Sequence, residues 1–191
     1  MRKDTKQRLL EVGLDLLLQH GYNDLGVQTL LTASGVPKGS FYHHFRSKQD
    51  FALQVVDRYM REVHAGLDAC LSAPERAPLE RIHTFFALSL EKYGREGYRG
   101  CLLGNLGQEL SAASDVFRYK IEWCFAEITA RIAVCLEQAR LRGDLPPDTD
   151  VHHMADLLLD CWEGAALRSR LQRDPAPLRA MLDFHFNHSA A

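Results

Sequence analysis

The chain has 191 residues, of which 46% are hydrophobic and 25% charged, and its formal net charge is −2 at pH 7. These values are typical of a globular protein that folds without disulfides or bound metal, and they argue against a protein that coats nucleic acid without sequence preference. No apolar stretch is long enough to span a membrane, and no apolar leader follows the charged start, so we expect a cytoplasmic protein without a membrane partner.

Apolar residues recur at helical spacing along the whole chain, and strand-like alternation does not occur. The pattern predicts an all-α protein of about nine helices. Five glycines between residues 94 and 107 lack the spacing of a phosphate-binding loop and predict a loop leading into a short helix. In chain order, the expected helices cover residues 4–20, 27–33, 38–44, about 50–70, 79–93, a short segment ending near 111, 115–142, 150–172 and 176–187.

The first fifty residues carry the strongest signal. After a first helix that stops at His20-Gly21, two short helices are joined by a turn that contains Gly35 and Pro37. Glycine suits a sharp turn, and proline suits the first turn of a new helix. Three helices in this order predict a helix-turn-helix unit. Ser47 and Asp50 have the spacing of a capping box for the next helix.

The second short helix has residue types that suit insertion into a DNA major groove. Lys38 and Ser40 lie at its N-terminus, where backbone N–H groups point at phosphate. Gly39 permits a close approach of the backbone to DNA. Tyr42 and His43 can donate to phosphates or base edges.

Neighbouring residues complete this expectation. Phe41 and Phe45, four positions apart, are interpreted as the buried face of the helix, and Lys48 is placed to reach backbone phosphate. A small excess of Lys and Arg in the first sixty residues favours DNA binding weakly. The alternative is a solvated charged surface on a small helical subdomain.

Residues 26–48, GVQTLLTASGVPKGSFYHHFRSK, closely resemble the DNA-binding signature of the TetR family of bacterial transcriptional regulators. The resemblance implies a DNA-binding domain over residues 1–48 and a sensor and dimerisation domain over 49–191. It also implies a homodimer on double-stranded, palindromic operator DNA, with half-sites about 34–36 Å apart. Leu31 departs from the usual alanine and should alter local packing. The DNA contacts that the resemblance implies are Thr29, Lys38, Gly39, Ser40, Tyr42, His43 and Lys48.

Residues 98–110 are similar to the N-ethylmaleimide-responsive (NemR-like) branch of that family, in which a Gly-Cys-Leu element carries a reactive cysteine. The similarity puts Cys101 in that place. A thiol at a helix N-terminus near Arg99 and Arg95 should have a lowered pKa. The alternative is a small side chain chosen for packing. The other cysteines lie in apolar stripes and are expected to fill the core: Cys70, Cys124, Cys135 and Cys161.

A second hypothesis for the sensor is a non-covalent pocket between the helices of 79–93, 101–111, 115–142 and 150–172, because cavities within helix bundles are common ligand sites. Large aromatic residues at helical spacing are also common in cores. The candidate lining residues are Phe86, Tyr93, Tyr98, Trp123, Phe125 and Trp162.

The last two helices are the expected dimer surface, since small residues there allow close helix approach and large apolar residues add area. An ordinary intramolecular core is the alternative. The candidate interface residues are Leu158, Gly164, Ala165, Leu167, Leu171, Leu178, Met181, Leu182 and Phe186.

No catalytic motif is present, and the histidines lack a convincing set of metal-ligand partners, so we expect no catalytic residue, metal or cofactor. The leading interpretation is a repressor that an electrophile or another small molecule releases from operator DNA. The alternative from a different class is a small helical thiol enzyme with Cys101 as nucleophile and a base such as His83.

Overall fold

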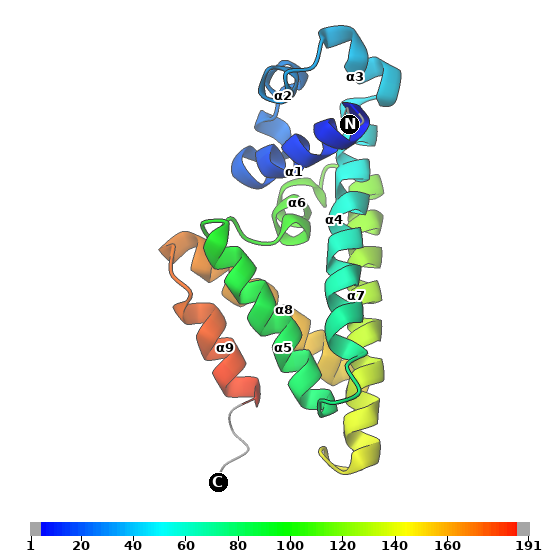
Figure 1. The fold of residues 1–191 in the computed structure, drawn as a ribbon, viewed down its shortest axis with the longest axis vertical. Helices are drawn as coiled ribbons and strands as arrows, with labels where there is room; N and C mark the ends of the chain where they lie inside the picture. Colours follow the sequence, from blue (N-terminus) through cyan, green and yellow to red (C-terminus); the bar gives the residue numbers. More distant parts are fainter. Residues whose placement is uncertain (1–4, 187–191) are drawn as a thin grey trace. The chain divides into compact units, whose positions relative to one another are not determined.

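The computed structural model describes residues 5–186, which form nine helices and no strand (Figure 1). The all-α prediction is confirmed over this part of the chain, and every expected helix is present. The helices are α1 (Thr5–Asp24), α2 (Val27–Ser34), α3 (Lys38–His44), α4 (Lys48–Leu71), α5 (Pro78–Arg95), α6 (Leu102–Leu110), α7 (Asp115–Arg142), α8 (Val151–Gln172) and α9 (Ala176–Phe186).

These helices are distributed over two compact units. One unit contains the described residues up to Glu62 together with Leu102–Glu122, and the other contains Val63–Cys101 and the described residues from Trp123 onward. The short helix α6 therefore packs with α1 in the first unit, although it follows α5 of the second unit in the sequence. The functional boundary at residue 48 stays a prediction.

The end of α1 differs from the simple stop expected at His20-Gly21. Gly21 leaves the helical path with φ 77° and ψ −179°, and one further turn runs from residue 22 to Asp24. A positive φ is accessible to glycine at little cost because glycine has no Cβ. The break redirects the backbone N–H groups of residues 22 and 23, which become available to partners outside the helix.

The helix-turn-helix is built as the sequence predicts. α2 ends at Gly35, which adopts φ 63° and donates its N–H to the carbonyl of Thr32 at 3.2 Å. Pro37 is extended and directly precedes α3. Phe41 and Phe45 are buried, and their ring centroids lie 5.6 and 5.1 Å from that of Phe51 on α4. This aromatic core holds a helix of seven residues, which is too short to be stable alone.

The capping box at the start of α4 forms in a modified version. The N–H of Asp50 donates to Ser47 Oγ at 3.0 Å, as expected. The Asp50 carboxylate accepts from the N–H of Arg46, at 2.8 Å, one residue before the position that a capping box usually bonds. This hydrogen bond is the largest cause that lowers the pKa of Asp50. A hydrogen bond from the side chain of Gln54 lowers it further.

In the second unit, α9 packs against both α5 and α8 (Figure 1). Ile82, Leu158 and Leu178, one from each helix, are fully buried. Asp150 caps the start of α8, and its carboxylate accepts from the N–H groups of His152 and His153 at 3.1 Å each. No helix between residues 5 and 186 is long and apolar enough to cross a membrane.

The prediction that the four other cysteines fill the core is correct for Cys70, Cys124 and Cys135 and wrong for Cys161, which is exposed. The buried stripe of α8 runs through Leu158, Trp162 and Ala166 at steps of four residues. Because a helix turns about 100° per residue, the position directly before Trp162 falls outside this stripe.

The close approach of α1 to α4 gives a test of the packing. A Cβ built on Gly13 would lie 2.3 Å from Phe51 Cζ, and Phe51 is buried on all sides. Alanine normally stabilises a helix interior over glycine by about 1 kcal/mol. We predict the opposite for Gly13→Ala, a loss of about 1–3 kcal/mol of unfolding free energy, since an overpacked core must rearrange.

The matched control is Gly66→Ala in α4, where the added Cβ would lie 3.6 Å from Phe85 in ordinary contact. This variant should gain about 0.5–1 kcal/mol. Urea unfolding midpoints of both variants and the parent chain measure the difference. Equal stabilisation by the two substitutions would contradict the packing described for α1 and α4.

Candidate functional site

Most of the predicted DNA-contacting residues of α3 are exposed, although the Tyr42 ring also packs edge-on against Phe41 with centroids 5.2 Å apart. Tyr42 is 66% exposed, Gly39 and His43 are exposed, and Ser40 is half-buried. A Cβ built on Gly39 would meet no atom within 4 Å, so this face is open. The helix therefore presents a small polar surface that no element among the described residues of its own unit covers. Thr29, on α2, is also exposed.

Lys38 begins α3, and its side chain lies outside the part of the chain that the structure describes. Lys48, expected to reach phosphate, is held inside the unit. Its Nζ donates to the carbonyl of Asn23 at 3.3 Å and lies 4.5 Å from the ring centroid of Tyr22. Burial lowers the pKa of Lys48, against an opposite and smaller effect of the carboxylates of Glu109 and Asp24. In this conformation Lys48 binds the end of α1.

The same end of α1 is held from the other side by Glu109, in the last turn of α6. Its carboxylate accepts from the N–H of Tyr22 at 2.7 Å and from the N–H of Asn23 at 2.6 Å. These are the N–H groups that the break at Gly21 redirects. A Cβ built on Gly21 would lie 2.8 Å from Glu109 Oε2, so the contact needs a glycine there.

The sequence analysis missed Glu109. The two partners are more than eighty positions apart, and nothing local marks a glutamate in a short helix as the partner of a distant backbone. The only signal was the glycine at residue 21, which predicted a break but not what binds there. Around the contact, the Tyr22 ring packs edge-on against Phe117 with centroids 5.2 Å apart. Burial, and secondarily Glu109, raise the pKa of Tyr22.

Cys101 directly precedes α6, as expected, and its side chain is 6% exposed. Its described hydrogen-bond partner is the carboxyl group of Glu163 on α8, a residue that the sequence analysis did not select. Burial, as the largest cause, raises the pKa of Glu163 to about 7.

The loop before the thiol has a left-handed backbone at Gly97, Tyr98 and Gly100. Tyr98 is the one non-glycine residue of this loop at positive φ, 54°.

Three of the six aromatic residues proposed for a pocket form one cluster. The Trp162 ring lies 4.9 Å from that of Phe86 and 5.7 Å from that of Tyr93, and all three side chains are buried. Tyr98 and Phe125 are half-buried, and Trp123 is 50% exposed. The structure thus supports a compact aromatic cluster from α5 and α8, and does not place all six residues around one space.

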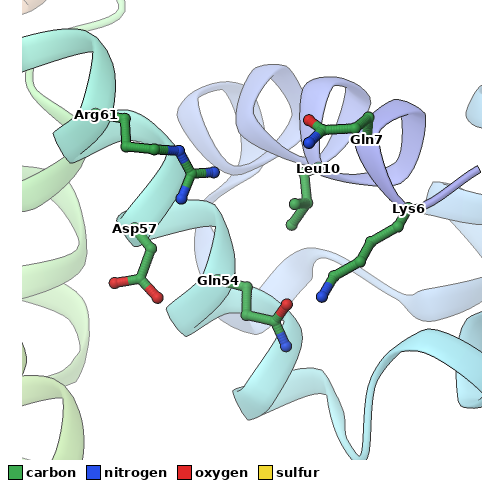
Figure 2. Close-up of a pocket in the computed structure, with 6 residues that line it drawn as sticks. All are labelled: Lys6, Gln7, Leu10, Gln54, Asp57 and Arg61. Carbon is green, nitrogen blue, oxygen red and sulfur yellow. The ribbon is translucent and has the colours of Figure 1, made fainter. Parts of the chain in front are cut away.

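A cleft of about 170 Å³ lies elsewhere, between α1 and the first half of α4 (Figure 2). It has an ammonium, a guanidinium and a carboxylate on its walls, and the carboxylate of Asp57 also pairs with Lys120 at 2.7 Å. Such a mixed lining favours no single ligand charge. The lining residues are Lys6, Gln7, Leu10, Gln54, Asp57 and Arg61. Within residues 5–186, no group of three or more His, Cys, Asp or Glu side chains is placed to hold a metal ion.

Comparison with known proteins decides the family. The model of bacterial regulatory proteins of the tetR family matches residues 9–55, and the model of the tetracyclin repressor-like C-terminal domain matches residues 78–184. The chain belongs to the TetR family. It is accordingly a DNA-binding transcriptional regulator and not an enzyme, which excludes the thiol-enzyme alternative.

Relatives of this TetR-family regulator cover nearly its whole length. The transcriptional regulator AcuR of Cereibacter sphaeroides is 39% identical over 91% of this chain and 80% of its own. The repressor DhaR of Mycobacterium is 34% identical, covering 97% and 92%, and the repressor NemR of Escherichia coli is 31% identical, covering 94% and 90%. The NemR-like resemblance is therefore confirmed, although AcuR and DhaR are more similar.

Solved structures agree with this assignment. A TetR regulatory protein from Rhodobacter sphaeroides superposes with a TM-score of 0.91 at 38% identity, covering 95% of this chain and 97% of its own. The reduced form of Escherichia coli NemR superposes with a TM-score of 0.88 at 31% identity, covering 97% and 96%.

In TetR-family regulators dimers are typical, and the candidate dimer residues here divide into two groups. Leu158, Leu178, Met181 and Leu182 are already buried within the chain. Gly164, Leu167 and Leu171 are exposed, while Ala165 and Phe186 are half-buried. We therefore restrict the predicted dimer surface to the second group, to which the exposed Leu157 and Phe184 add apolar area.

The contact between α6 and α1 can be tested directly. Glu109→Gln replaces one acceptor oxygen with an N–H₂ group that faces a backbone donor, so one of the two hydrogen bonds is lost. We predict faster amide hydrogen exchange at Tyr22 and Asn23 and a loss of about 1–2 kcal/mol of unfolding free energy.

Glu91→Gln on α5 is the control, because Glu91 pairs with Arg95 only at the surface, at 4.0 Å. Surface pairs of this kind contribute little. Unchanged exchange at Tyr22 and Asn23 in the Glu109 variant would show that the carboxylate does not hold this end of α1.

Proposed function

We propose that the regulator is a homodimeric repressor whose α3 helices bind operator DNA and whose release follows reaction of a small electrophile with Cys101. One observation carries the second half of this proposal. Cys101 directly precedes α6, and the last turn of α6 holds the end of α1 through Glu109. The thiol and the DNA-binding unit are thus joined by one short helix.

The exposed face of α3, with the neighbouring Thr29, supplies the DNA contacts in this proposal. Tyr42 and His43 reach phosphates or base edges, and the open surface at Gly39 allows close approach of the backbone. Two copies of this face in a dimer suit a palindromic operator with half-sites about one helical turn apart. Lys48 is bound to the end of α1, so its contribution to phosphate binding depends on the conformation of that end.

α6 gives the proposed response a physical route. A helix rises about 1.5 Å per residue, so roughly 12 Å of helix separates the thiol from Glu109. Cys101 is packed, and a group added to its sulfur needs room that a close-packed interior does not have. The adduct therefore favours a conformation in which α6 has moved. Differential stability of the two conformations is what shifts the population away from DNA binding.

The names of the relatives support both halves of the proposal. DhaR and NemR are named as repressors, and NemR has been solved in a form named as reduced. A second candidate is a non-covalent effector bound against the aromatic cluster of Phe86, Tyr93 and Trp162. Rings of this kind bind apolar ligands well, and this candidate needs no thiol chemistry.

Tyr42→Ala tests the DNA-binding face. We predict that operator affinity falls about tenfold, because a contact to phosphate or a base edge contributes about 1–3 kcal/mol. Fluorescence anisotropy on DNA from upstream of the regulator's own gene measures this at fixed salt. Tyr119→Ala is the matched control, since Tyr119 is 63% exposed on α7 and outside the predicted face. An equal affinity for both variants would remove Tyr42 from the contact set.

Cys101→Ser tests the trigger in the same assay. N-ethylmaleimide should release the parent protein from DNA and leave the Cys101→Ser variant bound, because serine lacks the nucleophilic thiolate. Cys161→Ser is the control: its exposed thiol is lost, but release by the reagent should persist. Release of the Cys101→Ser variant would place the trigger at another residue. Binding of the parent that is indifferent to the reagent would favour the non-covalent effector.

A further inference from the structure

Glu163 is a half-buried acidic residue for which DNA binding has no use. It lies on α8 one position after Trp162, in the second compact unit. Trp162 is 4% exposed and is packed between Phe86 and Tyr93. This turn of α8 is therefore fixed by its neighbours, and the direction of the Glu163 side chain is fixed with it.

The carboxyl group of Glu163 is hydrogen-bonded to the thiol of Cys101. A buried carboxylate is unfavourable unless it is paired with a cation or with hydrogen-bond donors. The hydrogen-bond partner of Glu163 is a thiol, which is a weak donor. The charged group that affects the pKa of Glu163, Asp160, is also an acid and raises it. This pairing does little for stability, but it puts a base in contact with a nucleophile.

Burial raises the pKa of Glu163 to about 7, with a smaller effect of Asp160 in the same direction and an opposing one of the bond to Cys101. A group whose pKa lies near the working pH can both accept and return a proton. An ordinary glutamate, with a pKa near about 4.3, is a weaker base and would seldom hold a proton to return.

We propose that Glu163 accepts the thiol proton of Cys101 and returns it to the substrate during covalent addition of a small, uncharged α,β-unsaturated carbonyl compound. This inference rests on the proposed function of Cys101 as the reactive residue. Glu163 is in contact with the reacting sulfur, so its role is in the chemistry and not only in placing the thiol.

The step balances without any further reactant. The carboxylate of Glu163 takes the proton from sulfur, and the sulfur electron pair forms a bond to the β-carbon of the substrate. The carbon–carbon π pair moves toward the carbonyl as an enolate. The protonated Glu163 then gives its proton to the α-carbon, and the carboxylate is restored. No oxidant is consumed and no group leaves.

Charge and size select this class of substrate. The proton passes from sulfur to carboxylate to carbon, so the pair of Cys101 and Glu163 gains no net charge during the reaction, and new charge is unfavourable beside a buried sulfur. An alkyl halide would release an anion beside Glu163 and Asp160, which is unfavourable. An anionic electrophile meets the same repulsion. Because Cys101 is 6% exposed, the substrate must also be small.

The test measures the rate at which N-ethylmaleimide, an uncharged cyclic compound of this class, alkylates Cys101. All proteins carry Cys161→Ser, because the exposed thiol of Cys161 would react as well. The tryptic peptide 100–118 contains Cys101 as its one cysteine, so mass spectrometry reports this site alone. We predict that Glu163→Gln slows alkylation at pH 7 by about a hundredfold, the lower end of the range for general-base catalysis.

The pH profile separates proton transfer from a loss of packing. In the parent the rate should rise as Glu163 loses its proton at about pH 7 and rise again at higher pH as the thiol itself ionises. Glu163→Gln should keep only the second rise. Glu163→Asp should retain the first rise with a lower rate, because the shorter carboxylate reaches less well. Asp156→Asn, an exposed acid on the same helix, is the control and should react like the parent.

Each outcome supports or overturns the inference. Alkylation of Glu163→Gln at the parent rate, or a parent profile without a rise at about pH 7, overturns the role of Glu163. If the glutamine variant no longer binds DNA and is therefore misfolded, the parent profile decides alone. If Cys101 of the parent is not alkylated at all, the proposed function and this inference both fail. Alkylation without release from DNA defeats the proposed trigger, while the rates still decide the role of Glu163.

Discussion

The carboxylate of Glu109 bound to two N–H groups at the end of α1 is the interaction on which the proposed response of this regulator depends. It joins a helix that begins at the candidate thiol to the helix that opens the DNA-binding unit. Two short hydrogen bonds to one carboxylate also fix the orientation of Glu109 relative to the end of α1, because a small shift of α6 lengthens one bond before the other. Lys48 binds the adjoining carbonyl, so the end of α1 has both its donors and an acceptor engaged.

The contrast between the two half-buried acids shows how their partners set their roles. Glu109 accepts from two backbone N–H groups at 2.7 and 2.6 Å, and it serves as a fixed structural link. Glu163 has a thiol as its partner and is raised in pKa by burial, so it can change protonation near neutral pH. The first suits the transmission of a displacement, and the second suits the chemistry that starts one.

Those parts of the structure that depend on residues close in sequence were predictable. Gly35 and Pro37 define the turn before α3, Ser47 and Asp50 define the start of α4, and Phe41 and Phe45 mark a buried face by their spacing. The partners of Gly21 and of Cys101 were not predictable, because more than sixty residues separate each from the acid that meets it. The exposure of Cys161 was missed for a related reason, since apolar spacing alone does not say which stripe of a helix a neighbour covers. Such contacts are set by how helices pack, which one sequence does not specify.

Helix α3 is short, and its buried face supplies most of the packing that holds it. Phe41 and Phe45 pack against Phe51 of α4, while Gly39, Tyr42 and His43 are exposed and only the Tyr42 ring also packs edge-on against Phe41, with centroids 5.2 Å apart. In the proposed mode of DNA binding, stability and sequence preference therefore depend largely on different residues of the same seven-residue element. Under that proposal, exchange of the exposed side chains of α3 changes the operator preference while the residues that anchor the helix are kept.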